Sequence, residues 1–269
     1  MKPARFDYAR PETLADAVKL LAGAGGDAKV IAGGQSLMPM LAFRLAAPKL
    51  LVDIGRLPDL KQIDVSPEGI ELGALVRWRD IEDSETLARA HPLLADAVRH
   101  VAHYQIRNRG TVGGSLAHAD PAAEMPGIAL TCDATIRVMG SGGERTIGAA
   151  DFFTGPLTTA LSSDEVIVSV RLPPWKLQRR WAFKEFARRR GDFALAGVAL
   201  FYDTDADGRA LAPHIGAIGV SSTPVRLQAC EAALEGSAES VEPMRTEVAQ
   251  AMNGKVVGFE SYELVAQSW

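Results

Sequence analysis

The chain has few of the residues that build metal centres or membrane anchors. Its 269 residues include only two cysteines, Cys132 and Cys230, so four thiolates for an iron–sulfur cluster are lacking and no zinc-ligand spacing occurs. No apolar run reaches the roughly 18 residues that a membrane-spanning helix needs. The start, Met1-Lys2-Pro3, lacks the apolar segment of a secretory signal. These absences predict a cytoplasmic protein with reduced thiols, no transmembrane segment and no metal ligands.

An excess of positive charge is also lacking. There are 29 lysines and arginines against 33 aspartates and glutamates, a formal net charge of −4. Nucleic-acid binding needs a basic face that neutralises phosphates, so nucleic acid is excluded as the main partner. An anionic ligand must therefore be held by local amides and a few side chains rather than by the overall field. Hydrophobic residues make up 47%, which is ample for a packed core of one to three compact units.

The two common phosphate-binding sequences are missing as well. There is no Gly-x-x-x-x-Gly-Lys-Ser/Thr and no Gly-x-Gly-x-x-Gly in a βαβ unit. Two Gly-Gly pairs are present instead, each expected between a strand and a helix. The first, Gly33-Gly34, follows an apolar strand and precedes Ser36, the expected N-cap of a helix with Pro39 in its first turn.

The second pair, Gly113-Gly114, lies in Thr111-Val112-Gly113-Gly114-Ser115. Asp120-Pro121 follows and predicts a helix that starts at Pro121 and is kinked or broken at Pro126. Glycine lets backbone approach a ligand closely, and successive N–H groups in a turn form an anion-binding concavity. Two such turns suit a ligand with two phosphates. The rival interpretation is a pair of ordinary tight turns, or a non-redox module for another phosphorylated ligand.

Three separated strings together indicate a known family. They are Ala32-Gly-Gly-Gln-Ser-Leu-Met-Pro39, the second glycine stretch with Asp120-Pro-Ala-Ala-Glu124, and Phe183-Lys-Glu-Phe-Ala-Arg-Arg-Arg-Gly-Asp-Phe-Ala194. They resemble the FAD-binding medium subunit of molybdenum hydroxylases, of the carbon monoxide dehydrogenase and xanthine dehydrogenase kind. The resemblance runs from Phe6 to about Leu234. The C-terminus departs from it, because an expected Tyr-Arg pair is missing before Trp269, which puts packing and partner contacts there in doubt.

The resemblance implies an α+β fold. It has a two-lobed FAD-binding domain of the vanillyl-alcohol oxidase-like (PCMH) type and a C-terminal α/β domain like that of the carbon monoxide dehydrogenase flavoprotein. We expect subdomains at residues 1–57 and 58–173 and a C-terminal domain at 174–269. Helices are expected at 11–24, 36–45, 92–103, 225–234 and 241–252. The main strands are expected at 29–32, 50–54, 60–65, 69–75, 134–139, 144–147, 165–172, 181–188, 193–204 and 211–220.

The resemblance also implies a set of FAD-binding residues and no catalytic residue. The set comprises Ala32, Gly33, Gly34, Gln35, Ser36, Leu37, Val101, Thr111, Gly113, Gly114, Ser115, His118, Asp120, Glu124, Ile167, Lys184 and Phe193. Each has a structural alternative. Asp120 equally suits an N-cap, Val101 and Ile167 suit plain core, Lys184 an exposed strand position, and Phe193 apolar packing.

By the same resemblance, the chain is an electron-transfer subunit that is active only in a complex. A large molybdopterin subunit and a small subunit with [2Fe-2S] clusters would be its partners, in a dimer of heterotrimers. Electrons would pass from the clusters through FAD to an acceptor such as NAD or a quinone. A stand-alone flavin oxidoreductase remains the alternative, although it would need an acid or base beside the flavin ring. The organic substrate is not readable from this chain.

Overall fold

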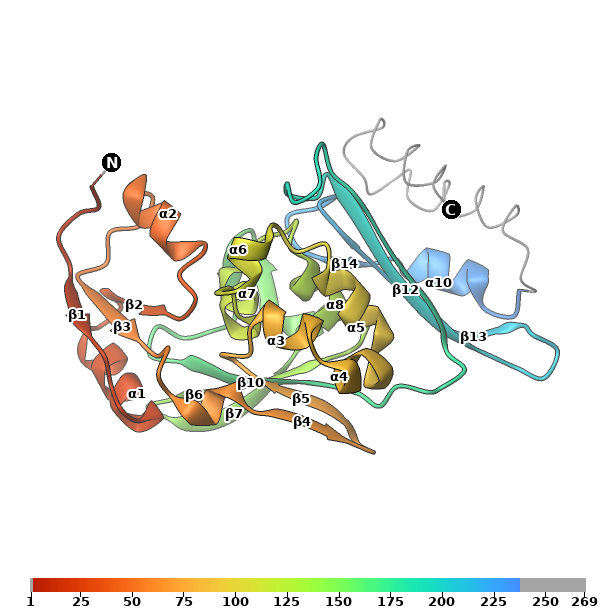
Figure 1. The fold of residues 1–269 in the computed structure, drawn as a ribbon, viewed down its shortest axis with the longest axis horizontal. Helices are drawn as coiled ribbons and strands as arrows, with labels where there is room; N and C mark the ends of the chain where they lie inside the picture. The colour runs from red at the N-terminus through yellow and green to blue at the C-terminus, as the bar shows by residue number, and fades with distance from the viewer. Residues whose placement is uncertain (1, 238–269) are drawn as a thin grey trace.

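The computed structural model describes residues 2–237, which form three main sheets and a separate two-stranded one, with helices packed between and around the main sheets (Figure 1). The first lobe lies at one end of the molecule, and the third sheet lies at the other. The expected helix at 241–252 falls outside the described residues. This mixed arrangement of helices and strands confirms the α+β class.

The first lobe has a three-stranded parallel sheet of order β1-β3-β2. Its elements are β1 (Asp7–Ala9), α1 (Leu14–Gly23), β2 (Ala28–Ile31), α2 (Leu37–Ala42) and β3 (Leu50–Asp53). Helix α1 begins three residues later than expected because Thr13 is its N-cap and accepts the Asp16 N–H. Its buried residues, Ala17, Val18 and Leu21, recur at the helical period and face the sheet.

The second sheet is antiparallel, with the order β4-β5-β10-β6-β7. Its elements are η1 (Pro58–Lys61), β4 (Ile63–Ser66), β5 (Gly69–Gly73), β6 (Thr135–Gly140), β7 (Gly143–Gly148), α9 (Ala149–Phe152), the small pair β8 (Phe153–Gly155) and β9 (Thr158–Thr159), and β10 (Val166–Leu172). The central strand, β10, serves two cores. Val166 and Val168 pack into the first lobe, whereas Ile167, Val170 and Leu172 pack under the helices.

Six short helices link β5 to β6 and lie between the second and third sheets (Figure 1). They are α3 (Trp78–Glu82), α4 (Glu85–Ala90), α5 (Pro92–Val98), α6 (Tyr104–Arg107), α7 (Val112–His118) and α8 (Glu124–Thr131). The single helix expected at 92–103 ends at Val98, because the chain turns through Ala102 with a positive φ of 39°. It resumes as α6.

The third sheet is antiparallel with the order β11-β12-β13-β14. Its elements are β11 (Arg180–Phe186), β12 (Ala196–Thr204), β13 (Ala210–Ile218), β14 (Val225–Arg226) and helix α10 (Gln228–Leu234). The inner face packs on α8, and the outer face carries α10. The helix expected from residue 225 begins at Gln228 instead, because Val225 and Arg226 pair with β13 first.

Candidate functional site: a glycine turn with free amides

The first glycine pair forms a true turn between β2 and α2. Gly34 has a φ of +71°, which side-chain-bearing residues rarely adopt. The Gln35 side-chain amide donates to the Gly33 carbonyl over 3.0 Å and closes the turn locally. The Met38 N–H donates to the Gly34 carbonyl and starts α2. The turn therefore stands fixed without help from a ligand.

Its amides are free. Within residues 2–237, no acceptor faces the backbone N–H groups of Gly34, Gln35, Ser36 and Leu37. Ser36 lies at the N-cap position as expected, but its hydroxyl makes no capping hydrogen bond. Adjacent unpaired N–H groups at a helix start attract anions. This turn can accept a phosphate group.

The second glycine pair differs from the expectation of a turn. Gly113 and Gly114 lie inside α7, whose N-cap is Thr111. The first-turn amides are all engaged: Val112 donates to Val76, Gly113 to Ala74, Gly114 to the Thr111 hydroxyl and Ser115 to the Thr111 carbonyl. A Cβ on Gly113 would lie 2.6 Å from the Ala74 Cβ. Here the glycine allows helix and strand to approach, and a tight-turn interpretation is wrong.

The predicted helix start at Pro121 is wrong too. Helix α8 begins at Glu124, because the Asp120 carboxylate accepts the Ala122 N–H and holds residues 120–122 in a turn. Asp120 is thus not the N-cap of α8; Ala123 occupies that position. Pro126 lies in the first turn of α8, where a missing N–H disrupts nothing, so no kink forms there.

The two glycine stretches nevertheless lie close together in space. A Cβ on Gly33 would stand 2.1 Å from the Arg109 carbonyl oxygen. The Arg109 guanidinium donates back to the Gly33 carbonyl over 3.4 Å. Segment 106–110 is therefore one wall of the first turn, and only glycine at position 33 permits that contact.

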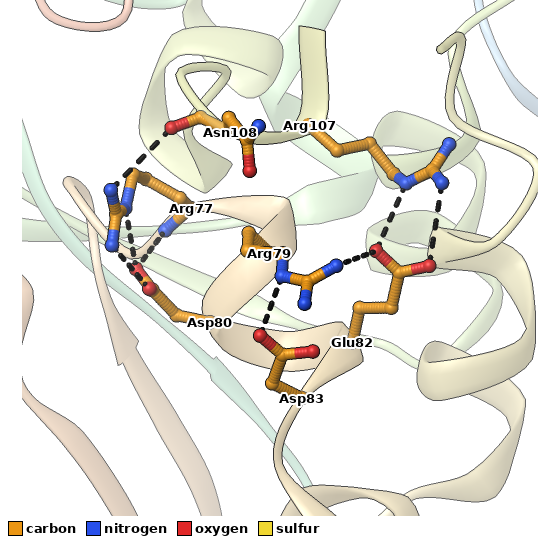
Figure 2. Close-up of polar contacts among 7 residues, drawn as sticks. All are labelled: Arg77, Arg79, Asp80, Glu82, Asp83, Arg107 and Asn108. Atoms are coloured by element: carbon orange, nitrogen blue, oxygen red, sulfur yellow. Dashed lines mark hydrogen bonds and ion pairs between the residues drawn. The ribbon is translucent and has the colours of Figure 1, made fainter. Parts of the chain in front are cut away.

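Ion pairs hold this wall in place (Figure 2). Figure 2 shows the Arg107 side chain forming a fork to Glu82, with its Nε 3.1 Å from Glu82 Oε2. Arg107 is only 13% exposed and also donates to the Val101 and Ala102 carbonyls. Arg77 pairs with Asp80 and donates to the Asn108 carbonyl. The Arg107–Glu82 pair is bidentate and largely buried, and a pair of this kind fixes geometry better than an exposed single contact. Sequence reasoning did not identify this network.

Several other expected residues lie deeper in the fold. Val101 and Ile167 belong to the core under the helices. His118 is in the last turn of α7, and burial lowers its pKa. Glu124 is the first residue of α8. Burial first, and then the charge of Asp120, raise the pKa of Glu124 to about 7.

Lys184 and Phe193 are not brought to the glycine stretches by any described contact. Lys184 is exposed and lies opposite Val198 of the outer core. Its neighbours in β11, Phe183 and Glu185, lie on the other face, since alternate residues of a strand point to opposite sides. Phe193 is 73% exposed on the loop after β11.

Glu185 is a residue that sequence reasoning missed. Its Oε2 atom is buried and has no hydrogen-bond partner in the described part of the chain. Burial, followed by the charge of Glu124, raises the pKa of Glu185 to about 8. The signal was present in the sequence: Glu185 alternates with Phe183, so a carboxyl lies on an apolar face of the strand.

A cavity of about 200 Å³ lies elsewhere, where the end of α8 meets β12 and β13. Arg179 stands over the rings of Trp175 and Phe201 and pairs with Asp203. Burial lowers the pKa of His91, on the cavity wall, to about 3. None of the expected site residues lines this cavity, and its charged groups have partners. The cavity therefore lies at the packing interface between the helices and the third sheet.

Residues 2–237 contain no helix long and apolar enough to cross a bilayer. The same residues contain no group of three or more His, Cys, Asp or Glu side chains placed to hold a metal ion.

Comparison with known proteins identifies the family. Residues 4–175 match the FAD binding domain in molybdopterin dehydrogenase, and residues 181–258 match the CO dehydrogenase flavoprotein C-terminal domain. The second match extends past residue 234, where the motif resemblance ends. The 6-hydroxypseudooxynicotine dehydrogenase complex subunit alpha of Paenarthrobacter nicotinovorans is 41% identical, over 94% of this chain and 86% of that protein. The nicotine 6-hydroxylase medium subunit of the same organism is 40% identical, over 97% and 90%.

Solved structures agree. Carbon monoxide dehydrogenase from Hydrogenophaga pseudoflava superposes with a TM-score of 0.93 at 34% identity, over 99% of this chain and 95% of that chain. Quinoline 2-oxidoreductase from Pseudomonas putida 86 gives a TM-score of 0.89 at 38% identity, over 94% and 88%.

The residues present fit FAD. The free amides of Gly34–Leu37 suit its pyrophosphate, and Gly33 lets segment 106–110 pack directly against the turn, where a Cβ would meet the Arg109 carbonyl. The acids Glu124, at the start of α8, and Glu185, on β11, lie on elements other than this turn. A turn with unpaired donors, family matches covering most of the sequence and close structural relatives lead to one conclusion: the chain belongs to the family of FAD-binding medium subunits of molybdenum hydroxylases.

Proposed function

We propose that this chain carries FAD within a multi-subunit molybdenum hydroxylase and passes electrons from iron–sulfur clusters of a partner subunit to an external acceptor such as NAD or a quinone. When bound, FAD supplies the chemistry of accepting electrons singly and releasing them as a pair. The chain's own residues bind the cofactor, orient it and tune its electronic properties. The unpaired amides of Gly34–Leu37 are the observation that carries this proposal.

We propose the following binding roles, which the free amides of the first turn and the packing of α7 support. Gly33, Gly34, Gln35, Ser36 and Leu37 hold the pyrophosphate, with Ala32 at the start of the turn. Thr111, Gly113, Gly114 and Ser115 bring α7 against the same site, with Gly114 exposed on its surface. We keep Val101, His118, Asp120, Glu124, Ile167, Lys184 and Phe193 as proposed cofactor contacts.

We propose the partners from the family to which the chain belongs. A large molybdopterin subunit and a small [2Fe-2S] subunit would complete a heterotrimer, and two heterotrimers would form the assembly. The chain's two cysteines, both buried, cannot supply four cluster ligands. We also propose the domain limits at residues 57 and 173 and a cytoplasmic location, which rests on the cysteine content.

Absorbance of the purified chain, followed by identification of any released chromophore, tests the proposal. We expect the two bands of oxidised flavin and release of FAD rather than FMN, because residues 4–175 match an FAD-binding domain and the free amides of Gly34–Leu37 suit a pyrophosphate. The companion variant Gly34→Ala, strained at a φ of +71°, should purify with less FAD. A colourless wild-type chain that takes up no added FAD, alone or co-expressed with its partner subunits, contradicts the proposal. Substrate turnover by the isolated chain favours the stand-alone enzyme instead.

A further inference from the structure

Two acids from the two matched segments of the chain interact electrostatically, since the charge of Glu124 raises the pKa of Glu185. Glu124 begins α8 and belongs to the segment at 4–175, whereas Glu185 lies on β11 and belongs to the segment at 181–258. Opposite Glu185 on β12 is Gly197, which has no side chain to pair with the carboxyl. The Oε2 atom of Glu185 is buried and without a hydrogen-bond partner among residues 2–237.

Among residues 2–237, no positively charged group offsets the negative charge of either carboxyl. The charge of Glu124 raises the pKa of Glu185, and the charge of Asp120 raises the pKa of Glu124. Lys184 lies on the opposite face of β11. His100, which packs against Phe183, has its pKa lowered by burial. Two like charges that interact across a largely apolar junction disfavour double ionisation.

Packing alone does not account for an acid here. A buried carboxyl without a partner costs free energy, and glutamine would fill the same volume without a charge. Unlike glutamine, glutamate can gain and lose a proton at such a position. The pKa values of about 7 and about 8 place that exchange near neutral pH.

We propose that Glu185, acting through Glu124, takes up a proton when the bound flavin is reduced. The inference rests on the proposed function, in which Glu124 contacts the cofactor. Electrons come from the iron–sulfur partner, or from dithionite in a test. As the flavin gains negative charge, an O–H bond forms on the ionised carboxyl of the pair with a proton from solvent. Reoxidation breaks that bond and returns the proton. Glu185 is a positioning residue, since it acts on the cofactor through Glu124.

Proton uptake on dithionite reduction of the flavin-loaded chain, followed with a pH indicator, tests this inference. At pH 8 the wild type should take up as much as about half a proton more per flavin than Glu185→Gln, because a group with a pKa of about 8 is half ionised there. The excess should vanish near pH 5, where both acids are already protonated. The exposed-acid control Glu68→Gln should match the wild type at every pH.

Two measurements make the result decisive. An infrared difference spectrum of the wild type should gain a protonated-carboxyl band on reduction at pH 8, even if Glu185→Gln fails to fold. Equal proton uptake in a flavin-loaded Glu185→Gln, or no such band in the wild type, overturns the inference and leaves the proposed function intact. A chain that binds no flavin overturns both.

The flavin-free chain gives a separate check on the pair. Because the folded-state pKa of Glu185 lies above the ordinary value of 4.5, its stabilisation is complete below pH 4.5 and is lost as the pH rises through about 8. The Tm of the wild type should therefore fall more between pH 6 and pH 9 than the Tm of Glu185→Gln. Parallel curves contradict the raised pKa and, with it, the inference.

Discussion

Gly33-Gly34 and Gly113-Gly114 are the same dipeptide, but the backbone N–H groups around them differ in hydrogen bonding. The first pair lies in an open turn, where the amides of Gly34–Leu37 have no acceptors in the described chain. The second pair lies at the start of a helix whose first-turn amides all have acceptors. Both pairs have one glycine pressed against backbone, Gly33 on Arg109 and Gly113 on Ala74. The Gly-Gly motif therefore marks close packing against backbone in both places, but free N–H donors only at Gly33-Gly34.

The two stretches therefore have different roles at the site. The first stretch presents backbone N–H donors. The second stretch, through Thr111 and the preceding segment 106–110, packs backbone against the first turn. Substitutions in the first should change flavin affinity, and those in the second should change stability. The following predictions test this division, beginning with the largest effect.

Gly33→Ala should be the most damaging to flavin binding. The new Cβ would stand 2.1 Å from the Arg109 carbonyl oxygen, so the turn must move away from its wall. Overpacking of this kind costs about 1–3 kcal/mol, which corresponds to a loss of about 10- to 100-fold in FAD affinity. Fluorescence titration of the flavin-free chain measures it. An unchanged Kd would show that the wall does not shape the cofactor site.

Gly113→Ala should act on the fold instead. Its Cβ would meet the Ala74 Cβ at 2.6 Å and the Ala74 carbonyl at 2.9 Å, and we expect a loss of about 1–3 kcal/mol in unfolding free energy by urea denaturation. The matched comparison is Gly114→Ala, whose Cβ would stand 2.8 Å from the Thr111 hydroxyl and from no backbone atom. Moving that capping hydroxyl costs about 1 kcal/mol, which the helix propensity of alanine offsets in part, so its loss should be the smaller one. Equal stability of the two variants would refute the packing role of Gly113.

The smallest expected effects come from the hydroxyl groups at two helix N-caps, Thr111 of α7 and Ser36 of α2. Thr111 accepts the Gly114 N–H over 3.1 Å, so Thr111→Ala should lower the unfolding free energy of the flavin-free chain by about 1 kcal/mol. Ser36 makes no capping bond, so Ser36→Ala should stay within about 0.5 kcal/mol of the wild type. With FAD present the order should reverse, because Ser36 belongs to the donor turn. Thermal melts with and without FAD measure both effects.

The sequence predicted most strands of the second and third sheets, because alternation and turn residues are local signals that burial does not overrule. Hence β4, β5, β6 and β7 overlap the strands expected at 60–65, 69–75, 134–139 and 144–147. Helix ends were less predictable. The start of α8 at Glu124 depends on the Asp120 turn, and the late start of α10 depends on pairing of Val225 with Ala217. Both are contacts that a local pattern does not specify.

The candidate site was predictable in part. Motif strings located the glycine stretches, but the state of their amides depends on Val76 and Ala74, which are 36 and 39 residues away from their partners in sequence. The Glu82–Arg107 fork and the burial of Glu185 likewise arise from packing between distant segments. Charged residues in a sequence are mostly exposed, so local reasoning assigns such residues to the surface.

Strand β10 has a consequence for the order in which the chain folds. The parallel pairs of the first lobe use residues 7–53, which leave the ribosome early. Their core nevertheless requires Val166 and Val168 of β10, more than 100 residues later. The first lobe should therefore remain loosely packed during synthesis and become compact only when β10 inserts between β5 and β6. Pulse proteolysis of nascent chains should show protection of residues 7–53 only after residue 172 has emerged.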